Sequence, residues 1–196
     1  MPASRRRSIG LAGAALWLVV ASEAFLMLSL WMIGTDAARL FFLVTATIAA
    51  VLVAVCVAMI LGVLRMPGAI PPRTPDEQAV VRRFMRVLAA EVVALILVGP
   101  VCLALRRPVL IVPLSVLIVG VHFLPLAWVF RVPRYYPLGL LFCAAVLLTL
   151  LMFPEDAHLG QATAWYVVPS MGCAPVAWLT AGANLREVSQ FVRKSA

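Results

Sequence analysis

The run Val109-Leu-Ile-Val-Pro-Leu-Ser-Val-Leu-Ile-Val-Gly-Val-His-Phe-Leu-Pro-Leu-Ala-Trp-Val-Phe130 decides the class of fold, because it contains no Asp, Glu, Lys or Arg. A helix needs about 20 mainly apolar residues to cross the hydrocarbon core of a bilayer. Basic residues flank the run, at Arg107 and Arg131. The sequence therefore predicts a transmembrane helix over 109–130, with the titratable side chain of His122 inside it.

The composition of the whole chain resembles that of this run. The 196 residues are 64% hydrophobic and 12% charged, whereas a soluble domain is closer to half apolar and one quarter charged. A soluble core of this length could not bury so much apolar surface, so the lipid bilayer is the expected partner. The net charge of +8 does not indicate nucleic-acid binding, because no loop is long enough to form a basic stripe on a water-facing domain.

Similar apolar runs predict an all-α fold, a bundle of transmembrane helices that forms one integral membrane domain over 1–196. Thr74-Pro-Asp-Glu77 matches a capping box, so the third helix is expected to begin in water before its span. The proline-rich segment 65–73 before it predicts a loop. The tail 184–196 predicts a short amphipathic helix on the membrane surface. The six predicted spans are 9–33, 40–64, 84–105, 109–130, 135–153 and 162–183.

Lys and Arg are distributed unequally between the two ends of these spans. Six spans place both termini on the same side of the membrane. All but three of the 16 Lys and Arg residues then lie on the side of the termini, and the exceptions are Arg39, Arg106 and Arg107. Basic residues accumulate on the cytoplasmic side of membrane proteins. We therefore expect both termini to be cytoplasmic.

The motifs of common enzyme classes are absent from the sequence. The four cysteines are far apart and form no Cys-x-x-Cys pair. A thiol oxidoreductase would require such a pair. No Gly-x-Ser-x-Gly motif, phosphate loop, dinucleotide fingerprint or haem-attachment motif is present. The two histidines, His122 and His158, have no metal-ligand spacing. We expect no catalytic residues, no metal and no cofactor, and a chain that is not an enzyme.

Three ionisable side chains lie inside the predicted spans: Glu23, Glu91 and His122. A charge at bilayer depth costs several kcal/mol, so such groups usually face the protein interior and find partners there. With about 1.5 Å of rise per residue, Glu91 and His122 lie at similar depths, roughly 10 and 12 Å from the same membrane interface. Glu23 lies about 8 Å further from that interface, near the middle of the membrane. We predict a buried polar cluster of the three, in which acid and imidazole can share a proton.

Prolines inside the predicted helices add polar backbone groups to this interior. A proline has no N–H, so the carbonyl four residues before it loses its helical hydrogen bond. Such carbonyls can line a polar cavity or bind a cation, although most are satisfied by a hydroxyl or by water. The carbonyls freed by the four prolines at 100, 125, 169 and 175 belong to Ile96, Val121, Trp165 and Met171.

These features leave three kinds of function open. The first is a membrane protein that holds or passes a proton, an ion or a small molecule through the pocket of Glu91 and His122, with Glu23 beyond it. The second is a structural or partner-binding membrane subunit, in which the same side chains only fix helix packing. The third is an intramembrane enzyme with a lipid-soluble substrate. The sequence leaves open whether the chain forms an oligomer.

The stretch His122-Phe-Leu-Pro-Leu-Ala127, followed by Phe130, Pro133 and Tyr135-Tyr136, resembles a segment of small multi-pass membrane proteins of bacteria to which no function has been assigned. The likeness covers a short part of the chain. It implies a compact helical bundle in the bacterial inner (plasma) membrane. It supplies neither a substrate nor catalytic residues.

Overall fold

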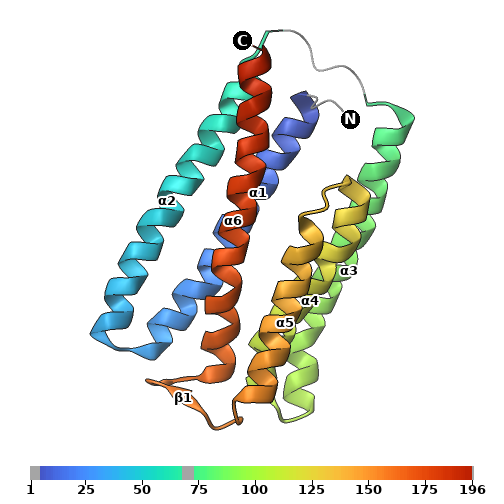
Figure 1. Cartoon of the computed structure of the whole chain (residues 1–196). Coiled ribbons are helices and arrows are strands. Elements are labelled where there is room, and N and C mark those ends of the chain that lie inside the picture. Colours follow the sequence, from blue (N-terminus) through green and yellow to red (C-terminus); the bar gives the residue numbers. More distant parts are fainter. Residues whose placement is uncertain (1–4, 68–72, 196) are drawn as a thin grey trace. The chain divides into compact units, whose positions relative to one another are not determined.

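The computed structural model describes residues 5–67 and 73–195, and the chain is all-helical apart from one small hairpin (Figure 1). A 3-10 turn, η1, leads into α4, and two-residue strands β1 and β2 pair antiparallel before α6. The elements are α1 (Arg5–Ile33), α2 (Asp36–Leu64), α3 (Pro75–Ala104), η1 (Pro108–Leu110), α4 (Ile111–Phe130), α5 (Tyr135–Met152), β1 (His158–Leu159), β2 (Ala162–Thr163) and α6 (Ala164–Ser195).

The chain forms two compact units. The first contains most of α1, all of α2 and the part of α6 from Ala174 onward. The second contains α3, α4, α5 and the hairpin, together with the first part of α6 up to Cys173. The helix α6 therefore belongs to both units.

In the second unit, α4 packs between α3 and α5 (Figure 1). The Phe84 ring of α3 contacts the Phe130 ring of α4, with 5.4 Å between the ring centroids. Because these residues lie near the start of α3 and the end of α4, the contact fixes the antiparallel register of the two helices. At the opposite ends of these helices, Arg107, which precedes η1, forms an ion pair with Glu155, which follows α5, with 2.8 Å between Nη1 and Oε2.

Two glycines allow α4 and α5 to approach closely. A Cβ atom built on Gly139 of α5 would lie 2.6 Å from the carbonyl oxygen of Gly120 on α4. A Cβ on Gly120 would lie 2.9 Å from the Phe142 Cβ and the Cys143 Sγ. Small residues let helix backbones meet in membranes, where packing contributes much of the association energy. Gly120 and Gly139 thus set the position of α4, the helix that carries His122.

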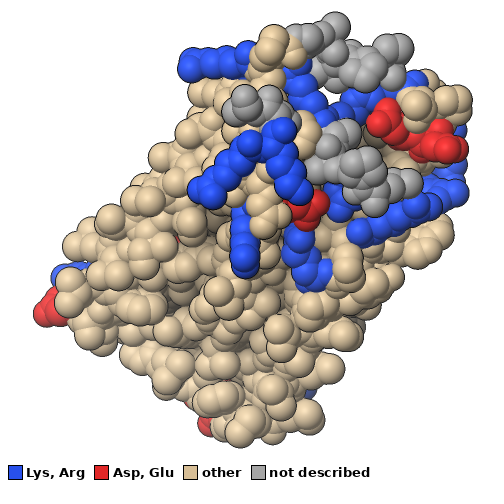
Figure 2. All heavy atoms as spheres, turned by 45° about the horizontal axis from the view of Figure 1, so that its top comes forward, with Lys and Arg blue, Asp and Glu red and all other residues tan. Residues whose placement is uncertain are grey.

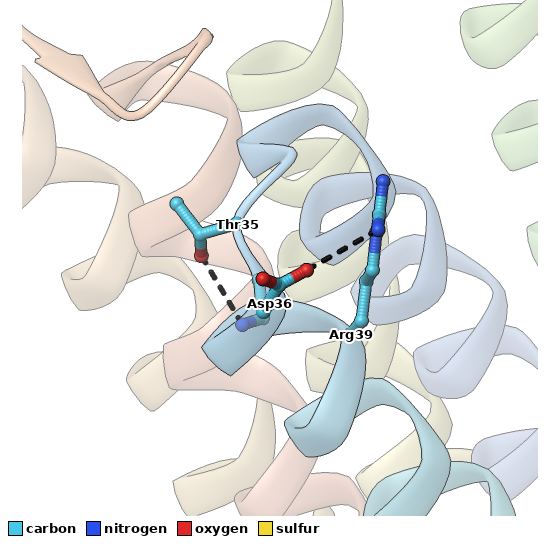
Figure 3. Close-up of polar contacts among 4 residues, drawn as sticks. Thr35, Asp36 and Arg39 are labelled. Atoms are coloured by element: carbon cyan, nitrogen blue, oxygen red, sulfur yellow. Dashed lines mark hydrogen bonds and ion pairs between the residues drawn. The ribbon is translucent and has the colours of Figure 1, made fainter.

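The starts of α2 and α3 follow capping rules. Thr74 accepts a hydrogen bond from the Glu77 N–H, and the Glu77 carboxylate accepts one from the Thr74 N–H, each at 3.2 Å. The predicted capping box is therefore present at the start of α3. At the start of α2, the Thr35 hydroxyl accepts from the Ala38 N–H at 3.2 Å, and Asp36 pairs with Arg39 (Figure 3).

In the first unit, basic side chains of α1 reach the ends of its neighbours. Arg5 donates hydrogen bonds to the carbonyl oxygens of Val63 and Leu64, at 2.9 and 2.6 Å. These carbonyls belong to the last turn of α2, where a cation complements the negative end of the helix. Arg7 pairs with Glu187 of α6, with 3.1 Å between Nη2 and Oε1. The start of α1 and the ends of α2 and α6 therefore lie together.

The outer faces of the helices are apolar. Figure 2 shows that most of the visible surface carries no charged side chain and that many of the Lys and Arg side chains lie close together. Large side chains such as Leu151, which is 82% exposed, would face water in a soluble protein. Among the described residues, five helices are long and apolar enough to cross a membrane: α1, α2, α3, α4 with its 3-10 turn, and α5. Five such helices indicate a multi-pass membrane protein whose apolar faces contact the lipid bilayer.

The last helix differs from its prediction. The predicted sixth span, 162–183, begins with strand β2 at 162–163. Its remainder and the predicted surface helix, 184–196, form one continuous helix, α6, as far as Ser195. The helix α6 is not among the five candidate spans, because Trp, Tyr, Pro and Ser residues dilute its apolar part. The sixth span thus stays a prediction. Residues 68–72 of the predicted loop 65–73, together with 1–4 and 196, lie outside the described residues.

Candidate functional site

Glu91 and His122 meet between α3 and α4. The distance from His122 Nδ1 to Glu91 Oε2 is 3.1 Å, and the two side chains are 9% and 13% exposed, respectively. The register set by Phe84 and Phe130 accounts for this contact. Glu91 follows Phe84 by seven residues and His122 precedes Phe130 by eight, which places both roughly 10–12 Å along the helices from that aromatic pair.

The contact between the two side chains is close but is not a well-formed hydrogen bond. Within the described residues, Nδ1 of His122 is buried and has no partner with hydrogen-bond geometry, so the Glu91 oxygen lies out of line with the ring N–H. The backbone carbonyl of Val87, one turn before Glu91 on α3, also lies within reach of the imidazole. The pair therefore retains unused hydrogen-bonding capacity inside the protein.

A cavity of about 400 Å³ lies beside the pair and is open to the surface, because Ala90 and Val121 of its lining are exposed. Both of its walls come from α3 and α4, and seven of its nine lining residues are apolar. Ala90 and Ala94, one helical turn apart on α3, leave the space that larger side chains would fill. The lining residues are Val87, Ala90, Glu91, Ala94, Leu117, Ile118, Val121, His122 and Pro125.

The four predicted helix-break carbonyls lie in different surroundings. Val121 lines the cavity together with Pro125, the proline that removes its helical partner. Ile96 on α3 is 66% exposed and does not line the cavity. On α6, Trp165 is buried and Met171 is exposed. Of the four, only Val121 is brought next to Glu91 and His122.

Glu23 belongs to the first unit. Its side chain is buried, with the residue 5% exposed, and neither carboxylate oxygen has a hydrogen-bond partner among the described residues. The Thr45 hydroxyl of α2 lies near the carboxylate, but it donates to the Phe42 carbonyl oxygen at 3.1 Å. That Glu23 joins Glu91 and His122 stays a prediction.

The pair can exchange or share one proton. An imidazole and a carboxylic acid in contact form an ion pair or a neutral pair, depending on which group holds the proton. Each form offers one hydrogen-bond donor and at least one acceptor to a third molecule. Within either unit, the described residues gather no three His, Cys, Asp or Glu side chains that could hold a metal ion. Proton exchange and hydrogen bonding are therefore the chemistry that this site offers.

No protein-family model, curated protein or solved structure matches the chain. The likeness of 122–136 to small bacterial membrane proteins thus stays an expectation from the sequence.

Proposed function

We propose that the chain is a multi-pass membrane protein that holds or passes a proton, an ion or a small molecule at the pocket of Glu91 and His122, without catalysing a reaction. The contact of 3.1 Å between the two side chains, at the wall of a cavity of about 400 Å³, carries the proposal. Buried ionisable groups are costly in a membrane and mark functional sites there.

The surroundings of Glu91 and His122 favour the binding of a molecule over the passage of an ion through the membrane. Between Val87 and Ala104, α3 has no polar side chain other than Glu91 and Cys102. On α4, the other polar side chain is Ser115, whose hydroxyl donates to the Ile111 carbonyl oxygen at 2.7 Å. A hydrated ion would need a continuous polar path, and these two helices supply none. A bound molecule needs only the pocket.

Proton transfer is tested by flux into vesicles. In vesicles that contain the wild-type chain and a pH-sensitive dye, we expect a membrane potential to drive a pH change faster than in empty vesicles if the pair passes protons. Glu91→Gln and His122→Ala remove the exchangeable proton or its acceptor, so either change should reduce the flux to that of empty vesicles.

The rival is a membrane subunit in which Glu91 and His122 only fix packing. In that case both variants unfold at a lower temperature. Their free energy of unfolding falls by about 0.6–2 kcal/mol, the amount typical of one interhelical hydrogen bond. They would also keep any flux or ligand binding of the wild type. That combination of results would contradict the proposal.

We further propose that the chain crosses a bacterial inner membrane six times with both termini in the cytoplasm. The support is the distribution of Lys and Arg, of which all but three of 16 lie on one side of the predicted spans. In the first unit, Arg5 at the start of α1 contacts the end of α2, and Arg7 contacts Glu187 of α6. Three basic helix ends thus share one end of the unit, as the positive-inside rule expects.

Lys194 gives a direct test of this orientation, because it is the single lysine of the sequence and is exposed. A membrane-impermeant amine reagent added to intact cells or right-side-out vesicles should leave Lys194 unmodified. The same reagent should label it after the membrane is permeabilised. Peptide mass spectrometry separates this site from the N-terminal amine. Labelling of Lys194 before permeabilisation would place the C-terminus outside.

A further inference from the structure

We infer that the molecule held at Glu91 and His122 is lipid-soluble, with an apolar body in the cavity and a carbonyl or hydroxyl head on the pair. This inference rests on the proposed function and names its ligand. The cavity volume of about 400 Å³ lies within the range of small-molecule sites, about 300–1,000 Å³. Such sites combine apolar walls with a few placed polar groups.

The walls select against a charged or hydrated ligand. Seven of the nine lining residues are apolar, and Glu91 and His122 are the two exceptions. Moving an ion from water into such a pocket costs far more than one carboxylate and one imidazole return. An apolar body gains from contact with Leu117, Ile118 and Val121. The ligand class that fits these walls is therefore uncharged.

The polar groups select for a head that can hydrogen-bond. His122 is more than nine-tenths buried, and its Nδ1 has no aligned partner within the described residues. Val121, whose carbonyl loses its helical partner to Pro125, lines the same cavity. A ligand oxygen near these groups would satisfy a buried nitrogen that is otherwise left unpaired, which costs about 1–3 kcal/mol. An alkane would leave this nitrogen unsatisfied.

The depth of the pair indicates how such a ligand is supplied. Glu91 and His122 lie roughly 10–12 Å from the Phe84–Phe130 contact, measured along the helices. If that contact marks a membrane interface, the pair lies within the hydrocarbon core, which is about 30 Å thick. A molecule dissolved in the bilayer is already at this depth. Two sources share the required chemistry: an isoprenoid-type quinone and a neutral glyceride.

Native mass spectrometry of the full chain in detergent tests the inference, with decylubiquinone and 1,2-dioctanoylglycerol as separate probes. We expect one of them to bind saturably, with one molecule per chain, and the probe that binds identifies the source. Ala94→Leu should weaken binding at least about tenfold, because a leucine fills the space that Ala94 leaves. Glu91→Gln keeps the size of the side chain and should weaken binding about tenfold through the lost acid.

Ala89→Leu is the matched control, because Ala89 is an exposed residue of the same helix and does not line the cavity. It should bind the probe like the wild type. Failure of both probes to bind, or wild-type binding by Ala94→Leu and Glu91→Gln, would overturn the inference. A proton flux that depends on Glu91 and His122, without binding of either probe, would overturn it and leave the proposed function standing. The absence of both would end both proposals.

Discussion

Gly139→Ala is expected to destabilise the second unit by about 1–3 kcal/mol, the usual cost of overpacking a well-packed interface. The new Cβ would lie 2.6 Å from the carbonyl oxygen of Gly120 and 3.0 Å from a methyl group of Leu124. The first of these atoms belongs to the backbone, so the strain can be relieved only if α4 and α5 move apart. Unfolding of the purified protein by SDS or by heat in detergent measures the loss.

Gly172→Ala is the matched control for this prediction. Its Cβ would lie 3.5 Å from the Ala145 Cβ of α5, an ordinary contact. Because alanine favours a helix over glycine by about 1 kcal/mol, this variant should be as stable as the wild type or more stable. A Gly139→Ala protein with the stability of Gly172→Ala would show that α4 and α5 are further apart than the structure has them.

The same variant connects packing to the pocket. Gly120 precedes His122 by two residues on α4, so a shift of α4 away from α5 changes the position of the imidazole relative to α3. We therefore expect Gly139→Ala to weaken binding at the pocket as well as to destabilise the fold. Gly120→Ala strains the same contact, through Phe142 and Cys143. Because either change alone separates the helices, the double variant should lose less than the sum of the single losses.

The helices of this fold follow from local sequence. The predicted spans 40–64 and 109–130 correspond to α2 and to η1 with α4, and the predicted cap at Thr74 is present. Length, apolar runs and capping residues act within a few turns of one helix, so they can be read without knowledge of its neighbours. The predicted depths of Glu91 and His122 rest on the same local count of residues, and the structure places the two side chains 3.1 Å apart.

The packing of apolar helix faces against one another could not be predicted in this way. The approach of Gly120 to Gly139 depends on which faces of α4 and α5 meet, and a run that is apolar on every side does not show this. The cavity has the same origin, because Ala90 and Ala94 form a gap only where α3 faces α4. The two glycines and the alanine pair were visible in the sequence as small residues in predicted spans. The residues that they contact on the neighbouring helices could not be predicted from the sequence.

Glu23→Leu is expected to stabilise the first unit by about 1–3 kcal/mol, in contrast to most substitutions of buried residues. Both oxygens of this buried carboxyl group lack hydrogen-bond partners within the described residues. A buried polar group without a partner costs about that amount, and a leucine of similar volume removes the cost. Heat or SDS unfolding measures the change. Glu23→Gln should gain little, because the amide needs partners just as the acid does.

The sign of the Glu23→Leu effect also decides whether Glu23 belongs to the pocket. If the carboxyl group stands alone beside Thr45, leucine stabilises the protein and leaves ligand binding at Glu91 and His122 unchanged. If Glu23 joins the other two side chains in the membrane, as the sequence predicts, leucine removes a partner of a polar network and destabilises the protein. Binding would then weaken as well. Thr45→Val separates these cases further, because it should alter binding only if Glu23 and its surroundings are part of the site.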